Sequence, residues 1–216
     1  MFRGLDVQLD KIIQKDIRDL STLDNSTIDS IKRLLFLLAN NDQTAVTNLS
    51  GALGITRPTV ESILDVLTKA ELIIRLPAHG SAEKKTRQPS KFLFMSPAVR
   101  MTLLDVTGIE STFLTQKGKL LEDIAGLHFY REFISTGKGS LAYDSSKNGA
   151  DFMLKIENKK QIIIEIGIGH KDTKQVENTM QKNRSDYGMV ICNRKELTLI
   201  EEKNLILIPK EFFLCM

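Results

Sequence analysis

The sequence predicts a two-domain protein of the α+β and α/β classes, with a helix-rich domain over residues 1–105 and a second domain over residues 112–216. Apolar residues recur at helical spacing from residue 5 to residue 67, as expected for a set of amphipathic helices. Beyond residue 140, short apolar runs alternate with polar turns and one polar helical pattern, which is typical of an α/β domain with a mixed sheet.

Four helices account for the first part of the chain. The first is predicted over residues 5–20, and the second opens at Ser26, whose hydroxyl can cap the free N–H groups of a first turn. The third ends at Gly54. The fourth begins after Thr56 with Pro58 in its first turn, where a missing N–H costs nothing.

Two strands are predicted after the fourth helix, over residues 71–76 and 91–95, and the polar stretch 79–90 separates them. Helices joined by a tight turn over residues 53–56 and followed by such a hairpin have the order of a winged helix-turn-helix domain. The polar stretch would then be the wing.

The second domain follows a connector over residues 96–119 that is partly helical. A helix, three strands, a polar helix and two final strands are predicted at residues 118–133, 140–143, 151–157, 161–167, 172–182, 188–192 and 204–209. Up to the first of the two final strands this is the order α-β-β-β-α-β, which predicts a mixed sheet.

Composition limits the classes of function. The net charge is only +3, so any binding of nucleic acid must come from local patches. The two cysteines, Cys192 and Cys215, have neither metal-ligand spacing nor a disulfide pattern, which suits a cytoplasmic protein. No apolar run approaches the roughly 20 residues that cross a bilayer, so no membrane partner is expected. The chain also lacks a GxxxxGK[ST] loop.

Two acids stand in or beside apolar strands of the second domain, Asp151 and Glu165. A carboxylate in an apolar strand is costly unless it is paired, hydrated or bound to a cation. Two such acids on adjacent strands could hold a hard divalent ion such as Mg²⁺ or Mn²⁺. A turn residue is the alternative interpretation of Asp151.

Several stretches together resemble one known family, although none is specific alone. They are Ile17–Leu20, Leu53–Val60 with Leu67, Lys91–Phe94, Gly118–Glu122, Gly149–Phe152 and Ile164–Gly167. In this order and spacing the chain resembles the C-terminal half of a prokaryotic, mostly archaeal, family of AAA+-type ATPases. In that family a winged helix and then a PD-(D/E)XK (restriction-endonuclease-like) nuclease domain follow the ATPase core. The resemblance implies that the ATPase core is absent from this chain, which is then a fragment or a stand-alone relative.

The resemblance also implies a set of site residues. The acids of the nuclease-like fold correspond to Asp151 and Glu165, and a helix glutamate that often adds a ligand corresponds to Glu122. Together they could bind Mg²⁺ or Mn²⁺, which would polarise a phosphate and lower the pKa of an attacking water. The alternative interpretation of Glu122 is a solvated helix residue.

The family's lysine, two residues after the second acid, is missing, because Gly167 occupies its position. Lys155 shares a strand face with Asp151, and Lys171 or Lys174 begins the next helix, so one of these could substitute. Without a substitute the nuclease-like domain is inactive.

A basic wing is the predicted contact with nucleic acid. Lys84, Lys85, Arg87 and Lys91 fall within it, and Arg100 would extend the patch. Such cations bind backbone phosphates in a salt-sensitive and mostly sequence-independent way. The alternative is a solvated hairpin tip.

The fourth helix offers fewer cations. Arg57, Thr59 and Lys69 are its candidate contacts with nucleic acid, whereas Glu61 and Asp65 would repel phosphates. A winged helix with such a surface can equally serve as a protein-docking module.

Three functions therefore remain open. The first is a nucleic-acid-binding regulatory module of an AAA+-type ATPase, with an inactive nuclease-like domain, DNA as ligand and its own or a partner ATPase domain as partner. On this interpretation the chain alone is not an enzyme. The second is an active metal-dependent nuclease. The third is a protein–protein assembly module, which could be a homo-oligomer.

Overall fold

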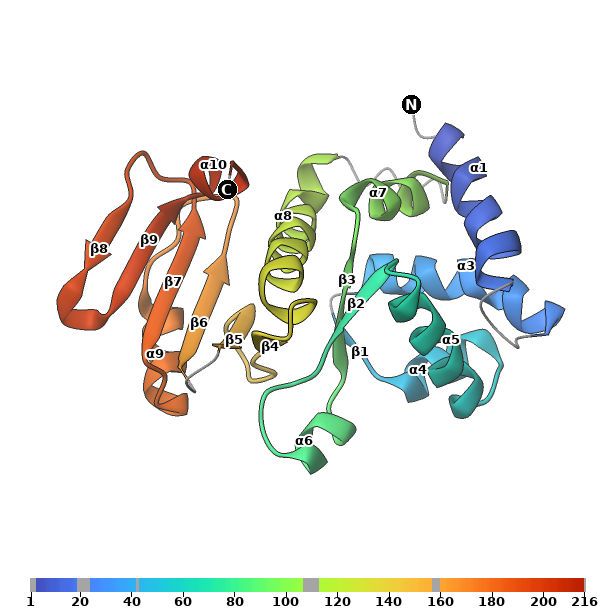
Figure 1. Cartoon of the computed structure of the whole chain (residues 1–216), viewed down its shortest axis with the longest axis horizontal. Coiled ribbons are helices and arrows are strands. Elements are labelled where there is room, and N and C mark those ends of the chain that lie inside the picture. Colours follow the sequence, from blue (N-terminus) through green and yellow to red (C-terminus); the bar gives the residue numbers. More distant parts are fainter. Residues whose placement is uncertain (1–2, 19–23, 42, 107–112, 157–159, 216) are drawn as a thin grey trace. The chain divides into compact units, whose positions relative to one another are not determined.

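The computed structural model describes residues 3–18, 24–41, 43–106, 113–156 and 160–215 (Figure 1). The chain divides into two compact units. Unit 1 comprises residues 1–75 and 89–116, and unit 2 comprises residues 76–88 and 117–216. The sequence places all of residues 1–105 in one domain, so the assignment of residues 76–88 differs.

Unit 1 combines helices with a small sheet. Its helical elements are α1 (Arg3–Lys11), the π-helix η1 (Ile12–Ile17), α3 (Asn25–Asn40), α4 (Val46–Leu53), α5 (Arg57–Lys69) and α7 (Pro97–Val106). Its strands are β1 (Gln43–Thr44), β2 (Ile73–Leu76) and β3 (Ser90–Phe94), in the order β1-β3-β2. The chain order helix, short strand, helix, helix and two strands is that of a winged helix, as the sequence predicted.

The helices of unit 1 form because each buries one apolar stripe. In α3, Ile31, Leu34, Leu35 and Leu38 recur at helical spacing and are fully buried. The helix begins earlier than predicted, because its N-cap is Asp24 rather than Ser26. The Asp24 carboxylate accepts a hydrogen bond of 2.7 Å from the backbone N–H of Thr27.

The turn between α4 and α5 follows the prediction closely. Gly54 ends α4 in the left-handed region at φ 71°, which glycine adopts without a steric penalty. Thr56 then caps α5 by accepting a hydrogen bond from the N–H of Thr59, and Pro58 lies in the first turn. Strand β1 was not predicted, since two residues are too few to give an alternating pattern.

The predicted wing is a short helix, α6 (Ala82–Arg87), within residues 76–88. Ser81 caps this helix. This segment makes backbone contacts inside unit 2: the N–H of His79 donates to the carbonyl of Tyr143 over 2.8 Å, and the N–H of Tyr143 donates to the carbonyl of Pro77 over 3.2 Å. The wing is therefore joined to the α/β unit by main-chain hydrogen bonds.

Unit 2 is an α/β unit around a six-stranded sheet of order β4-β5-β6-β7-β9-β8. Its strands are β4 (Gly139–Ala142), β5 (Phe152–Ile156), β6 (Gln161–Ile166), β7 (Tyr187–Cys192), β8 (Thr198–Ile200) and β9 (Leu205–Pro209). Its main helical elements are α8 (Phe113–Phe129, from Lys117 onward), the π-helix η2 (Tyr130–Ile134), α9 (Lys174–Asn183), the 3-10 helix η4 (Glu201–Lys203) and α10 (Lys210–Leu214). Strands β4, β5 and β6 pair antiparallel, whereas β6, β7 and β9 pair parallel.

Helices α8 and α9 cover opposite faces of this sheet. Phe129 of α8 packs edge-on against Phe152 of β5, with ring centroids 5.7 Å apart. Val176 of α9 belongs to a cluster with Met153, the next residue of β5. Because neighbouring strand residues point to opposite faces, the two helices lie on opposite sides. The predicted order α-β-β-β-α-β is present, while β8 and α10 were not predicted.

None of the helices in the described ranges is both long enough and apolar enough to span a bilayer.

Candidate functional site

The pairing of β5 with β6 brings the two predicted acids together. Asp151 directly precedes β5, and Phe152 lies opposite Ile164 in the antiparallel register, so Asp151 faces Glu165 across the pair. The Oδ2 atom of Asp151 accepts a hydrogen bond of 2.9 Å from the backbone N–H of Ile166. Asp151 is thereby fixed to the strand that carries the second acid.

Glu165 is the most deeply buried group of the site, with 1% of its side chain exposed. Its Oε2 atom accepts a hydrogen bond of 2.8 Å from the amide Nε2 of Gln175, which also donates over 2.8 Å to the carbonyl of Gly149. Its Oε1 atom forms an ion pair with the ammonium of Lys171. Burial, and then the charge of Asp151, raise the pKa of Glu165 to about 7, although Lys171 acts in the opposite direction.

Lys171 occupies the space that Gly167 leaves open. A Cβ atom on Gly167 would lie 2.6 Å from Cε and 2.7 Å from Cγ of Lys171. The lysine side chain therefore passes over the glycine to reach Glu165. A lysine is present at the acid after all, but it comes from the loop that follows β6.

The other predicted substitute, Lys155, is not part of this group. It lies at the far end of β5, opposite Gln161, and its side chain is exposed. Four residues of extended strand separate it from Asp151, about 13 Å. Lys174 opens α9 and is exposed.

Glu122 of α8 is half-buried and lies near enough to act on Lys171. Burial lowers the pKa of Lys171, but Glu165, Asp151 and Glu122 together outweigh burial and raise the pKa above its ordinary value. Within the ranges that the structure describes, no three His, Cys, Asp or Glu side chains come together as a metal-binding group. Glu122 therefore does not complete a three-carboxylate set.

Two carboxylates fit a magnesium-like cation, because Mg²⁺ is commonly held through one or two carboxylates and keeps several waters. The negative charge of Asp151 repels that of Glu165, and a cation bound between the two carboxylates would relieve this repulsion. Asp151 and Glu165 are thus the residues that could hold Mg²⁺ or Mn²⁺.

The predicted nucleic-acid contacts on α5 are exposed at its two ends, with Arg57 in the first turn and Lys69 in the last. The hydroxyl of Thr59 lies 2.8 Å from the hydroxyl of the N-cap threonine. Glu61, between them, forms a two-point contact with Arg75 of β2. The charge of Glu61 is thus paired with that of Arg75 within unit 1, which weakens its repulsion of a phosphate.

Burial separates the predicted cations of the wing into accessible and inaccessible residues. Lys84 is half-buried and Lys85 and Arg87 are exposed in α6, where Arg87 pairs with Glu83 at 2.8 Å. Lys91 was wrongly placed in this group, because it lies within β3 and is only 5% exposed. Arg100 was also wrongly added to the patch, since it is buried and donates to the carbonyls of Ala39 and Phe92.

The wing cations share their surroundings with Lys155. The pKa of His79 is lowered, first by burial and then by the charges of Lys84, Lys85 and Lys155, while Asp144 acts in the opposite direction. Cations from two distant stretches of the sequence are thus close enough to act on one imidazole. No sequence pattern indicated this, because the two stretches are far apart in the sequence.

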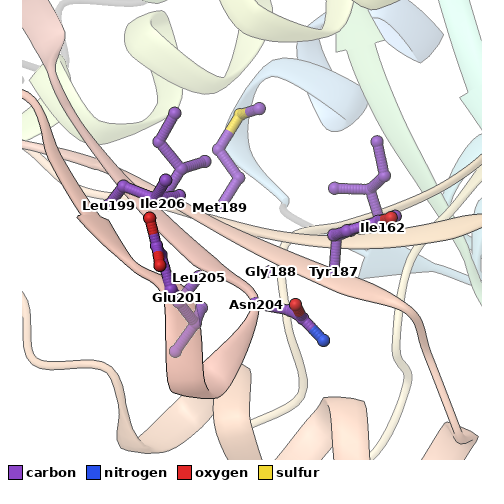
Figure 2. A pocket seen from close by; sticks show the side chains of 9 residues that line it. All are labelled: Ile162, Tyr187, Gly188, Met189, Leu199, Glu201, Asn204, Leu205 and Ile206. Carbon is purple, nitrogen blue, oxygen red and sulfur yellow. The ribbon is translucent and has the colours of Figure 1, made fainter.

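Two pockets lie at opposite ends of the parallel strands of unit 2. An apolar pocket of about 420 Å³ lies at their N-terminal ends (Figure 2). Its lining residues are Ile162, Tyr187, Gly188, Met189, Leu199, Glu201, Asn204, Leu205 and Ile206. A polar pocket of the same volume lies at their C-terminal ends and includes His170, Arg194 and Lys195. The sequence did not indicate the Gln175 contact, because only the fold brings this residue to Glu165, and it did not single out Arg194 or Lys195.

The fold and the site define a class, a winged-helix unit joined to an α/β unit that carries a pair of carboxylates, one of them buried. Residues 2–110 match the model of the family described as "Domain of unknown function (DUF8612)". The match covers about half of the chain, and the chain belongs to this family.

A relative from Methanocaldococcus jannaschii, named "Uncharacterized protein MJ1637", is 31% identical over 218 residues. The alignment covers 100% of this chain and 45% of the relative, so the chain spans less than half of that protein's length.

Two solved structures are also similar. The adhesin competence repressor AdcR from Streptococcus pyogenes is 18% identical with a TM-score of 0.30, over 62% of this chain and 92% of that chain. A mutant of MepR from S. aureus is 17% identical with a TM-score of 0.29, over 62% of this chain and 94% of that chain. These scores are too low to carry an argument, and the winged-helix assignment depends on the element order of unit 1.

Proposed function

We propose that this chain binds nucleic acid and that its α/β unit hydrolyses phosphodiester bonds with the help of a divalent cation. The observation that carries the proposal is the meeting of Asp151, Glu165 and Lys171 at one end of β5 and β6. On this proposal, the three residues would serve as the acid, acid and lysine of a PD-(D/E)XK nuclease site, with the lysine supplied from four residues beyond Gly167.

Asp151 and Glu165 would hold Mg²⁺ or Mn²⁺. When bound, such an ion supplies polarisation of a phosphoryl oxygen and a lowered pKa for a coordinated water. Lys171 would orient the attacking water and stabilise negative charge on the phosphate, because its ammonium already lies beside Glu165. Gln175 would keep the Glu165 carboxylate in one orientation, since it also bonds to the main chain at Gly149.

The cations on α6 and the ends of α5 would contribute contacts to backbone phosphates. Lys84 and Lys85 supply charge near Lys155 in unit 2, Arg87 adds a cation on the same helix, and Arg57 and Lys69 supply charge in unit 1. Such contacts favour DNA without a strong sequence preference.

The proposal also includes a further domain that acts together with this chain. The chain spans 45% of its archaeal relative, which leaves room in such proteins for a further domain. Following the resemblance to AAA+-type ATPases, we propose that this domain is an ATPase core that acts with this chain in the cytoplasm, in one polypeptide or as a partner.

The test is cleavage of supercoiled plasmid DNA in the presence of Mn²⁺ or Mg²⁺. The parent protein should nick the plasmid, and Asp151→Ala and Glu165→Ala should each reduce the rate by at least about 100-fold, because each removes a candidate cation ligand. Lys171→Ala should reduce the rate similarly, whereas Lys138→Ala, at an exposed position in the turn before β4, is the matched control and should leave it unchanged.

A stricter test moves the lysine back to the strand. The double variant Gly167→Lys/Lys171→Ala should recover part of the activity that Lys171→Ala loses, because it returns an ammonium to the same face of β6. If the parent protein nicks DNA and both Asp151→Ala and Glu165→Ala nick it equally well, the cleavage comes from elsewhere and the proposal is wrong.

One observation favours a second candidate function, an inactive nuclease-like unit that serves as a binding platform. Both carboxylate oxygens of Glu165 are already engaged, one by Lys171 and one by Gln175. Calorimetry with Mn²⁺ separates the two candidates: binding that is lost on Asp151→Ala supports the enzyme, and absence of binding together with absence of nicking supports the platform.

A further inference from the structure

A polar pocket lies beyond the carboxyl ends of β6 and β7, on the loops that follow these two strands. It has a volume of about 420 Å³ and is lined by His170, Asn193, Arg194, Lys195, Glu196 and Thr198. The carboxyl ends of parallel strands are a common place for ligands in open α/β sheets. Whether this pocket suits a ligand is decided by the residues that line it.

Backbone hydrogen bonds hold the two loops against each other. The N–H of Asn193 donates over 3.0 Å to the carbonyl of Gly169, and the N–H of Gly167 donates over 2.9 Å to the carbonyl of Ile191. The ammonium of Lys210 donates over 3.0 Å to Oδ1 of Asn193, which fixes this side chain from β9's end. The base of the pocket is thus preformed.

The charge of the pocket suits an anion. Arg194 and Lys195 contribute two cations, His170 and Asn193 contribute N–H donors, and Glu196 contributes a single negative charge. Arginine offers paired N–H groups in a geometry that matches phosphate oxygens, and lysine adds a point charge. The pocket at the other end of the same strands is mainly apolar and offers no comparable set (Figure 2).

The pocket lies a short distance along the strands from the carboxylate pair. Glu165 pairs with Val190 in the parallel register of β6 and β7, and Asn193 follows Val190 by three residues. Three strand residues cover about 10 Å. That length is about three nucleotides of axial rise along a B-form strand, so one polynucleotide strand could meet both sites.

We propose that this pocket holds a backbone phosphate of the nucleic-acid strand whose nearby phosphodiester bond meets Asp151 and Glu165. The inference depends on the proposed function for the second contact, but the pocket's own affinity for a strand does not require cleavage. Arg194 and Lys195 would bind the phosphate, and His170 would connect the pocket to Lys171, the next residue.

The experiment measures fluorescence anisotropy of a labelled DNA duplex in EDTA, where no cleavage occurs, between about 50 and 200 mM salt. Arg194→Ala/Lys195→Ala should raise the Kd about tenfold and lower the slope of log K against log salt by about 1 to 2. Arg131→Ala/Lys138→Ala is the matched control, because it removes the same two residue types from exposed positions of unit 2 outside the pocket. This control should leave both quantities unchanged.

Equal losses in the two double variants would overturn the proposal, because general charge would then explain the binding. Unchanged DNA binding in Arg194→Ala/Lys195→Ala, with loss of inorganic phosphate binding by calorimetry, would also overturn it and assign the pocket to free phosphate. If this variant binds DNA normally while Asp151→Ala abolishes cleavage, only the pocket inference fails. If the parent never cleaves DNA but the variant binds tenfold more weakly, only the proposed hydrolysis fails.

Discussion

Unit 1 and unit 2 use their charged side chains in different ways. In unit 1, Arg75 is bound to Glu61 and Arg100 is buried against backbone carbonyls, so both guanidinium groups support the fold. In unit 2, charged side chains gather beyond the ends of β6 and β7, around Glu165 and Lys171 and in the polar pocket. The unit whose fold is associated with DNA binding thus offers fewer available cations than the unit with the carboxylate pair.

The contrast indicates that a fold and the placement of its charges must be considered separately. A winged helix supplies a helix that can enter a groove, but phosphates are bound by exposed cations. On α5 these are confined to Arg57 and Lys69 at its ends. We therefore expect unit 2 to contribute most of the affinity for nucleic acid.

The largest effects are expected from substitutions that truncate a core side chain in either unit. Phe152→Ala in β5 should lower the free energy of unfolding by about 3 to 5 kcal/mol and reduce any cleavage by the folded protein, because this fully buried ring supports the strand beside Asp151. Leu64→Ala in α5 is the counterpart in unit 1, with an expected loss of about 2 to 5 kcal/mol. Urea unfolding gives both energies, and nicking assays below the transition give the activity.

The comparison would fail if Leu64→Ala reduced cleavage by the folded fraction as much as Phe152→Ala does. Unit 1 would then be as necessary for the chemistry as the strand that carries the acid.

A smaller effect should follow from Asp144, a buried carboxylate of unit 2. Burial acts to raise its pKa, but hydrogen bonds from Ser146 and the charge of Lys182 outweigh burial and leave the pKa below its ordinary value. The stabilisation from the ionised carboxylate is therefore present above the ordinary pKa of 3.8 and is lost as the pH falls through the lower, folded-state pKa.

Asp144→Asn should accordingly cost about 1 to 3 kcal/mol at neutral pH, and the difference from the parent should shrink below about pH 4. Thermal unfolding across this pH range measures it. If the difference in stability between the parent and Asp144→Asn stayed constant down to the most acidic buffer, the charge of Asp144 would not be the source of the stabilisation.

The smallest effect is expected on α5. Arg57→Ala/Lys69→Ala should weaken binding of a DNA duplex by only about two- to threefold, because two exposed cations at opposite ends of a helix make few phosphate contacts. Anisotropy under the conditions used for the polar pocket provides the measurement. A loss of tenfold or more would reverse the comparison and make α5 the main contact.

The elements with strong local signals were predictable from the sequence. The turn from Gly54 to Thr56 and the apolar stripe of α3 have a single local interpretation, and the structure has both. Strand β1 and helix α10 were missed, because two and five residues are too short to establish a periodic pattern. The N-cap of α3 was placed two residues late, since Asp24 and Ser26 are both good capping residues.

The candidate site was predictable only in part. Asp151 and Glu165 could be chosen because acids beside apolar strands need a partner, and Lys171 was one of several candidate lysines. The choice among these lysines depends on the course of the loop after β6, which periodicity does not describe. The burial of Lys91 depends on tertiary packing in the same way, and the sequence therefore misplaced it on the surface of the wing.

Gly167 has no side chain, and the side chain of Lys171 passes through the space above it. A lysine on the strand would provide both the position and the charge, whereas here two residues share these roles. The glycine determines where the side chain can pass, and Lys171 brings the charge from the following loop. Changing the length of residues 168–170 by a single residue would therefore retune the reach of the ammonium without touching the sheet. Searches that require a fixed spacing between acid and lysine will overlook proteins built in this manner, and a variable gap would recover them.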